Sequence, residues 1–273
     1  MARLVPLVRA AHVQPAVAVT ALVTALGVAA GRGWSSVWLC LAMLSGQLFT
    51  GWSNDWLDRH RDVAAGRTDK PIAAGQVPAS VVVLCALVSL VACVPLSLAN
   101  GLAAGLVHLA AVASAGLYNA LLKRTVLSPL PYAFSFGSLP WFVTLGLPGH
   151  PSPPWWATVA AALLGVGAHF VNTLPDQTAD RALGVFGLPQ RLGRTPSLFL
   201  GALLLAAAGQ LLAIAPPGPP SVLARVLGIV QLAAVCGVVA TGSTGRERAA
   251  WTLTLAAAGL AVVLLLANGA SLA

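Results

Sequence analysis

Long apolar runs, separated by short polar or Pro- and Gly-rich connections, occupy most of this chain of 273 residues. Each run is about as long as the roughly 20 residues that a helix needs to cross a bilayer. The runs are rich in Ala, Leu and Val and do not alternate with polar residues, which is typical of spanning helices and not of a membrane β-barrel. The pattern predicts an all-α polytopic membrane protein with nine transmembrane helices, at residues 11–30, 34–53, 79–99, 101–122, 126–147, 155–175, 197–215, 221–241 and 249–270.

The composition agrees with a chain embedded in lipid. Hydrophobic residues make up 58% of the sequence and charged residues 8%, whereas about a quarter of an average soluble domain is charged. A soluble fold of this length has no means of covering so much apolar surface. The cysteines all lie inside apolar runs without Cys-x-x-Cys spacing, so we interpret them as small core residues and expect neither a cysteine metal site nor disulfides.

The formal net charge of +8 is unevenly distributed. If the connections after the second, fourth, sixth and eighth helices lie on the side of the N-terminus, that side carries every basic residue except Arg32 and Arg225. The positive-inside rule then places the N-terminus in the cytoplasm and the C-terminus outside it. This distribution indicates a membrane topology and not a nucleic-acid partner. The predominance of Arg over Lys, with abundant Ala, favours a bacterial inner membrane.

The chain has only seven acidic residues, and six of them lie in two clusters on the predicted cytoplasmic side. Asp55, Asp58, Asp62 and Asp69 follow the second predicted helix, and Asp176 and Asp180 follow the sixth. Glu247 stands alone between two arginines, and we interpret it as an ordinary solvated loop charge. Balancing the nearby arginines is the simpler interpretation of any one aspartate, but clustering in so acid-poor a chain favours function.

Both clusters have helical spacing. On a helix that continues from the second span, Asp55, Asp58 and Asp62 share one face. The second cluster places Asp176 and Asp180 four residues apart, and Asn172 extends it by one further step of four. We expect a proline beside Asp176 to kink this helix end without destroying the stripe.

The two clusters belong to an internal repeat with an offset of 118 residues. The matched pairs are Asn54/Asn172, Asp58/Asp176, Asp62/Asp180, Gly66/Gly184, Pro71/Pro189, Gly75/Gly193 and Pro78/Pro196. The repeat predicts one transmembrane domain over residues 1–273. It comprises two parallel four-helix repeats, at about 11–122 and 126–241, and a ninth helix at about 249–270. Parallel repeats put both stripes at the same membrane surface, around a central cavity open to the cytoplasm.

Two facing carboxylate stripes favour a Mg²⁺ site, because Mg²⁺ prefers oxygen ligands and commonly binds through carboxylates together with substrate phosphates. The Asn side chains add neutral oxygen ligands, and nearby Lys and Arg are expected to contact the outer phosphate oxygens. A diphosphate bound here would leave its hydrocarbon tail between the helices. That combination describes a prenyl diphosphate.

The motifs Asn54-Asp55-x-x-Asp58-x-x-x-Asp62 and Asp176-x-x-x-Asp180 resemble the two signature motifs of the UbiA superfamily of intramembrane prenyltransferases. The resemblance implies transfer of a prenyl group from its diphosphate to a small-molecule acceptor, by Mg²⁺-assisted loss of diphosphate and capture of the allylic cation. It implies that the five aspartates are catalytic and bind Mg²⁺. The predicted diphosphate-binding residues are Asn54, Asn172, Lys123, Arg124, Arg181, Arg59 and Arg61.

Alternatives remain open at this stage. A terpene cyclase of the same superfamily would use the same acids without an acceptor, and a non-enzymatic transporter is a more remote possibility.

Tyr118 precedes Lys123 by five residues, whereas parts of the family have a spacing of four, so a direct role of Tyr118 is not predicted. His169 is either a proton acceptor or a packed core residue. The aromatic residues near the motifs are either cation-stabilising or core residues. The acceptor, expected to be aromatic or lipophilic, and the oligomeric state are not determined.

Overall fold

The computed structural model describes residues 4–267 and residue 272. Helix makes up 78% of the described residues, which contain no strand. The last positions of the ninth predicted span, 268–270, lie outside the described residues. The helices are α1 Leu4–Ala10, α2 Val13–Ala29, η1 Gly33–Ser35, α3 Ser36–Ala64, α4 Ala79–Leu98, α5 Leu102–Ala120, η2 Leu122–Arg124, α6 Pro129–Gly137, α7 Leu139–Thr144, α8 Trp155–Asn172, α9 Gln177–Ala182, α10 Leu188–Leu192, α11 Arg194–Ile214, α12 Val222–Ser243 and α13 Glu247–Ala267.

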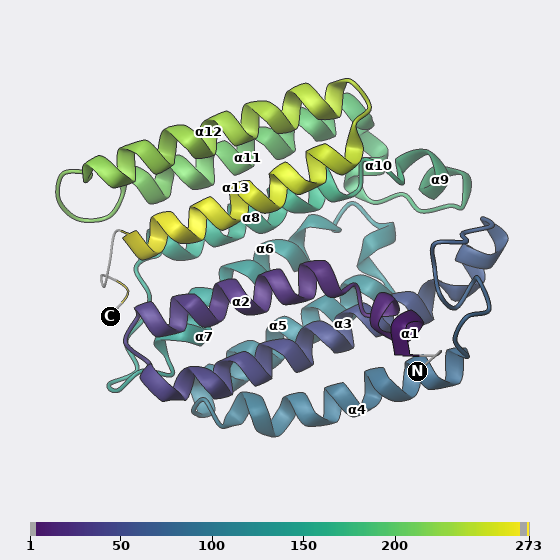
Figure 1. Cartoon of the computed structure of the whole chain (residues 1–273), viewed down its shortest axis with the longest axis horizontal. Coiled ribbons are helices and arrows are strands. Elements are labelled where there is room, and N and C mark those ends of the chain that lie inside the picture. Colours follow the sequence, from purple (N-terminus) through teal and green to yellow (C-terminus); the bar gives the residue numbers. More distant parts are fainter. Residues whose placement is uncertain (1–3, 268–271, 273) are drawn as a thin grey trace.

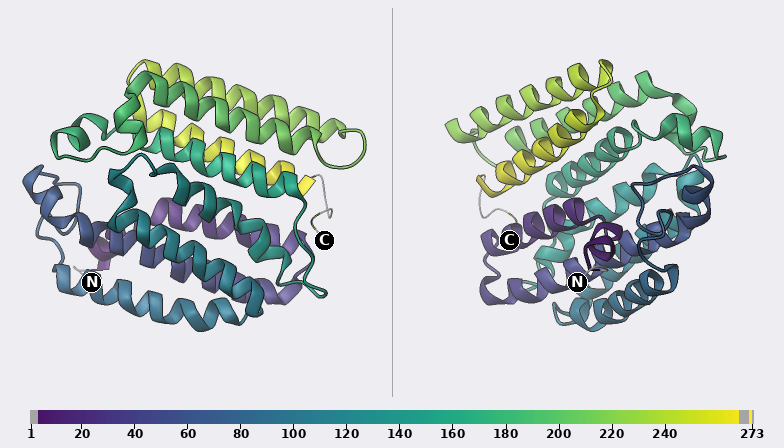
Figure 2. Two further views of the ribbon diagram at one scale, coloured as in Figure 1. Left: turned by 180° about the vertical axis from the view of Figure 1, so that it is seen from behind. Right: turned by 45° about the vertical axis from the view of Figure 1, so that its right-hand side comes forward.

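The long helices run side by side in one bundle (Figure 1). Consecutive helices pack as neighbours around the bundle, and α13 returns to contact both α2 and α8, which closes the arrangement. The α3–α4 connection and the segment that carries α9 and α10 both lie at the end of the bundle drawn on the right of Figure 1. The views in Figure 2 show the same two connections next to each other. The bundle therefore brings the two segments that contain the acidic motifs to one end.

Eight of the nine predicted spans correspond to one long helix each. The span predicted at 126–147 is instead divided at Ser138 into α6 and α7, which together cover only residues 129–144. Among the described residues, six helices (α4, α5, α8, α11, α12 and α13) are long and apolar enough to cross a membrane. The pair α1 and α2, bent by 65°, would make a seventh. Membrane-spanning helices are thus present, and the count of nine stays a prediction.

The outer and inner faces of the bundle differ in the way expected of a protein in lipid. Large apolar side chains point outward, such as Val91 on α4, which is 72% exposed, and Ile229 on α12, which is 67% exposed. The buried faces instead use many small residues, among them Ala160, Ala208 and Ala257. Small residues allow helices to approach closely where apolar burial gives no driving force, because the lipid is itself apolar.

The helix ends that follow the two acidic motifs have the same backbone geometry. The amide of Arg67 donates to the carbonyl of Asp62 at 3.0 Å, and, 118 residues later, the amide of Val185 donates to the carbonyl of Asp180 at 2.8 Å. The glycine before Arg67 has φ 64°, and the glycine before Val185 has φ 75°. This is the Schellman ending of a helix, which needs a left-handed residue that glycine adopts without strain.

Candidate active site

The first acidic motif lies on the last turns of α3, a helix of 29 residues whose first half is apolar. Asp55, Asp58 and Asp62 are all buried, with 1%, 4% and 4% of their surface exposed. They lie along one face of a continuous helix, as their spacing predicts. Buried carboxylates are costly unless they meet cations or hydrogen-bond donors, so their surroundings indicate what the site is built to hold.

The second acidic motif does not form the predicted continuous stripe. Helix α8 ends at Asn172, the chain turns through residues 173–176, and α9 begins only at Gln177. The expectation that Pro175 would only kink the helix is therefore wrong. Proline has no amide hydrogen and disfavours the helical conformation of the preceding residue, so the helix stops. Asp176 comes to lie in the turn with its side chain 48% exposed, and Asp180 lies on α9.

Basic side chains from other parts of the chain reach the first motif. Lys70 Nζ lies 3.3 Å from Asp55 Oδ1. Asp58 is paired twice, with Arg61 at 2.8 Å and with the ammonium of Lys123, which arrives from η2. Burial lowers the pKa of Lys123, although the charge of Asp58 opposes this effect. The carboxylates of the first motif are thus held by the chain's own cations.

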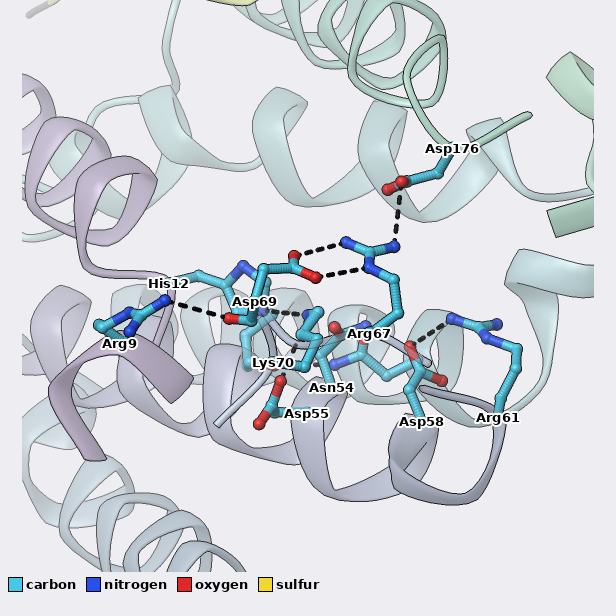
Figure 3. A network of polar contacts seen from close by, with 12 residues as sticks. Arg9, His12, Asn54, Asp55, Asp58, Arg61, Arg67, Asp69, Lys70 and Asp176 are labelled. Atoms are coloured by element: carbon cyan, nitrogen blue, oxygen red, sulfur yellow. Dashed lines mark hydrogen bonds and ion pairs between the residues drawn. The ribbon is translucent and has the colours of Figure 1, made fainter. Parts of the chain in front are cut away.

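An arginine that follows the first motif in the chain contacts the second motif. Arg67, in the connection after α3, lies 3.0 Å from Asp176 Oδ1 and forms two hydrogen bonds of 2.8 Å with Asp69 (Figure 3). The hydrogen bond from Arg67 lowers the pKa of Asp69 to about 2. Asp180 has a neutral partner instead, because Gln190 Nε2 donates to its Oδ2 at 2.8 Å. Burial raises the pKa of Asp180.

The other predicted diphosphate-binding residues lie in three kinds of surroundings. Asn54 lies in the motif and donates to Asn119 at 3.2 Å, and Arg181 donates to the carbonyl of Gln190, next to the second motif. Arg59 is turned aside: its guanidinium lies 4.5 Å from the Trp56 ring centroid, and it donates to the Trp56 carbonyl. Two residues are exposed at the same end of the bundle, Arg124 and Asn172.

The donor set fits a hard divalent cation. In the described part of the chain, Asp55 Oδ2 and Asp62 Oδ2 are buried without a hydrogen-bond partner, and Asp55 Oδ1 has only the ion pair with Lys70 at 3.3 Å. Carboxylate oxygens left without donors are the ligands that Mg²⁺ prefers. No three His, Cys, Asp or Glu side chains among residues 4–267 converge on one point, so the motifs alone do not form a complete protein cage. Mg²⁺ sites commonly use substrate phosphates as further ligands, which agrees with this open arrangement.

An aromatic cluster lies next to the motifs, and we call Tyr118, Tyr132 and His169 the floor cluster. The rings of Tyr132 and His169 are stacked at 4.5 Å, and Tyr118 meets them edge-on at 5.0 and 5.6 Å. Gly165 on α8 makes the stacking possible: a side chain there would come within 2.7 Å of the Tyr132 carbonyl on α6. The Tyr132 side chain also interacts with Asn172 of the second motif.

Sequence reasoning missed several residues that contact the motifs. It counted Arg67 and Lys70 only as loop charges and did not consider Asn119 or Gln190. A loop has no periodicity from which its contacts can be predicted. The position of Arg67 and Lys70 soon after the first motif was the one feature of the sequence that indicated a contact with it. Asn119, one residue after Tyr118 in an otherwise apolar helix, was detectable as a buried polar group.

Together these features define a helical membrane protein with two acidic motifs that converge, with basic side chains between them, at one end of its bundle. A family model described as the UbiA prenyltransferase family matches residues 14–255. The chain belongs to this family. A comparison with proteins of curated function finds no match.

Solved structures with similar folds support the same assignment. A UbiA homolog from Aeropyrum pernix K1 has a TM-score of 0.75 and 19% identity, over 92% of this chain and 96% of that one. A UbiA homolog from Archaeoglobus fulgidus, bound to GPP and Mg²⁺, has a TM-score of 0.69 and 18% identity, over 97% and 98% of the two chains. A structure described as digeranylgeranylglyceryl phosphate synthase has a TM-score of 0.68 and 16% identity, over 99% of both chains. At these identities the similarity establishes the fold.

Proposed function

We propose that this protein is a Mg²⁺-dependent prenyltransferase that moves a prenyl group from its diphosphate to a small, lipophilic or aromatic acceptor. The observation that carries the proposal is that the two acidic motifs lie at one end of the bundle, where Arg67, five residues after the first motif, lies 3.0 Å from Asp176 of the second. Membership of the family supports the reaction class. The A. fulgidus homolog of the same fold, whose structures hold GPP or DMAPP with Mg²⁺, supports the donor and the metal.

The five aspartates would hold Mg²⁺ next to the diphosphate. When bound, Mg²⁺ neutralises the negative charge that develops on the leaving diphosphate. Lys70, Lys123 and Arg67 already pair with motif carboxylates. If those carboxylates held Mg²⁺ instead, the three cations would be free to bind outer phosphate oxygens, for which ammonium and guanidinium groups are suited. Further positive charge around the diphosphate would come from Arg61, Arg181 and Arg124. Neutral ligands would come from Asn54 and Asn172.

The site would open to the cytoplasm, with nine spans, two parallel four-helix repeats and a ninth helix in a single domain. The thirteen-to-two distribution of basic residues between the two sides supports this orientation, and the matched Schellman endings of α3 and α9 support the duplication. A topology reporter fused after Ala273 should then report the extracytoplasmic side, and one inserted at Gly245 should report the cytoplasm. Reports of the same side from both fusions would contradict the nine-span arrangement.

The reaction is tested with the full chain in lipid nanodiscs. We expect Mg²⁺-dependent binding of geranyl or geranylgeranyl diphosphate, and diphosphate release that rises sharply when a suitable phenolic acceptor is added. Chelation of Mg²⁺ with EDTA should abolish release, and added Mg²⁺ should restore it. Mass spectrometry of the organic product identifies the acceptor that was prenylated.

Two outcomes would contradict the proposal in different ways. A cyclised terpene formed at full rate without acceptor would make the protein a cyclase and leave the metal site intact. Failure to bind any prenyl diphosphate with Mg²⁺ would contradict both enzymes. A variant carrying Asp58→Asn and Asp180→Asn serves as the control for release that does not depend on the site.

A further inference from the structure

A buried histidine in the floor cluster has no assigned role in the metal or diphosphate site. His169 is 1% exposed and lies on α8, three residues before Asn172. The floor cluster to which it belongs is next to both motifs, because Asn54 of the first motif donates to Asn119, the residue after Tyr118, and His169 itself lies one turn before Asn172. The histidine is therefore close to the place where a diphosphate would meet its hydrocarbon chain.

The two ring nitrogens of His169 have different surroundings. Nε2 lies 3.1 Å from the hydroxyl oxygen of Ser128, which is fully buried. The same hydroxyl oxygen accepts the backbone amide of Leu188 at 3.1 Å. The other nitrogen, Nδ1, is buried without a hydrogen-bond partner in the described part of the chain. A buried polar atom without a partner calls for an explanation, and a ligand is one.

The hydrogen positions follow from counting partners. If Ser128 donates its hydroxyl hydrogen to Nε2, Nδ1 carries the ring hydrogen, and only this N–H is left unpaired. In the other tautomer both the Ser128 hydrogen and the Nδ1 lone pair would be unpaired. Each unpaired buried group is unfavourable, so the first arrangement is preferred. His169 then presents a hydrogen-bond donor and not a base.

We infer that the Nδ1–H of His169 donates a hydrogen bond to the ester oxygen that joins the prenyl chain to its diphosphate. The inference rests on the proposed function. His169 lies three residues deeper than Asn172, which is about 4.5 Å along the helix. When the C1–O bond breaks, its electron pair stays on the ester oxygen, which becomes more negative, so the hydrogen bond strengthens as the bond breaks. His169 keeps its proton throughout.

The same geometry gives the rest of the floor cluster a role. Bond breaking leaves an allylic cation at C1, and the faces and edges of the Tyr118 and Tyr132 rings lie beside His169. Aromatic faces attract cations through their quadrupole. The cation is then captured by the acceptor, or by water when no acceptor is present, and the proton released by that capture leaves with solvent.

The test compares geranyl diphosphate with geranyl S-thiolodiphosphate, in which a weakly accepting sulfur replaces the ester oxygen. In nanodiscs with Mg²⁺, wild-type protein should bind the oxygen ester about fivefold to tenfold more tightly. His169→Phe should lose this preference by binding the oxygen ester more weakly. Its diphosphate release should fall by about 10²-fold, the size of one donor to a developing oxyanion.

Two further variants separate the donor from packing. The amide nitrogen of Asn has the position of Nδ1, so His169→Asn should retain most of the preference for oxygen, and His169→Gln should not. Ser128→Ala removes the partner that orients the ring and should reduce the preference, which keeps the test available if His169→Phe folds poorly. His108→Phe is the matched control, because His108 is also buried, stacked on a phenylalanine and bonded to a serine; its preference should be that of wild type.

The outcomes distinguish the inference from the proposed function. A folded His169→Phe protein that still prefers the oxygen ester as wild type does would overturn the inference alone. Loss of release in His169→Asn as large as in His169→Phe would also overturn it, since a donor at the same position would then not suffice. Failure of the wild type to bind either diphosphate would overturn the proposed function and this inference with it.

Discussion

The two acidic motifs have nearly the same spacing, yet the structure holds them differently. In the first, Asp58 is buried on an unbroken helix and paired with two cations of the chain. In the second, Asp176, its counterpart in the repeat, lies in a turn and is about half exposed. One residue accounts for much of this difference: Pro175 stands where the first copy has Leu57. Leucine continues a helix and proline ends it.

Two motifs with the same spacing of carboxylates can therefore differ in how firmly the fold holds them. The first motif is fixed by helix packing and by Lys123, so its carboxylates have little freedom. The second motif lies in a turn and on a six-residue helix, α9, and its contact with the segment after the first motif is the ion pair between Asp176 and Arg67. Short helices and exposed turns are the parts of a protein that open most readily. We expect the first motif to act as the rigid half of the site and the second as the half that adjusts when metal and diphosphate bind.

Substitutions in the first motif, the rigid half of the site, should have the largest effect on rate and stability. Asp58→Asn and Asp62→Asn should each lower the rate of prenyl transfer by at least about 10²-fold, as expected for the loss of one electrostatic contact to the leaving group. Asp58→Asn should also destabilise the fold, because it leaves Lys123 buried without its counterion; breaking such pairs costs about 3–5 kcal/mol. Turnover and thermal unfolding in nanodiscs measure both effects. Near-normal turnover in either variant would remove the first motif from the site.

In the second motif, a substitution should be able to lower the rate of prenyl transfer without much change in the stability of the fold. Asp176→Asn and Asp180→Asn should each also cost about 10²-fold in rate, but Asp176→Asn should change stability by less than about 1 kcal/mol, since its ion pair with Arg67 is partly exposed. The same two assays apply. If Asp176→Asn turns over normally, the second motif does not contribute through this residue. If it unfolds as readily as Asp58→Asn, the distinction between the halves is wrong.

The connection between the halves predicts a small pH effect. Arg67 lowers the pKa of Asp69 to about 2, below the roughly 3.9 of an unfolded chain. The stabilisation is therefore present above about pH 4 and is lost as the pH falls toward 2. Asp69→Asn should lower the free energy of unfolding at pH 7 by less than about 1 kcal/mol, seen as a slightly lower unfolding temperature, and the difference from wild type should shrink at pH 3. A difference that grows on acidification would contradict this linkage.

The smallest effect should come from the one acid outside both motifs. Glu247, which belongs to neither motif, pairs with Arg194 between α13 and α11. Glu247→Gln should leave turnover within about twofold of wild type and change stability by less than about 1 kcal/mol. It thus serves as the baseline for the aspartate variants. A rate loss comparable to theirs would show that charge removal at this membrane surface is not specific to the motifs.

Much of the fold could be predicted because its signals are local. The length of each apolar run predicts a helix whatever its neighbours are, and eight of nine predicted spans correspond to single helices. The ninth prediction, at 126–147, is divided at Ser138, because hydropathy over a window does not detect a break within it. The face shared by Asp55, Asp58 and Asp62 was predictable for the same local reason, since helical periodicity depends only on spacing.

The sequence by itself determined which residues are acidic, where they cluster and that the clusters repeat. Only the tertiary structure decided which cation meets which carboxylate. Lys123 reaches Asp58 across 65 residues, and Arg67 reaches Asp176 across 109. Such contacts depend on how helices pack and where loops close, and neither leaves a periodic signal in the chain. The floor cluster likewise depends on tertiary packing. Its three residues come from three helices, and they meet because a glycine lets α6 approach α8; the residues are Tyr118, Tyr132 and His169.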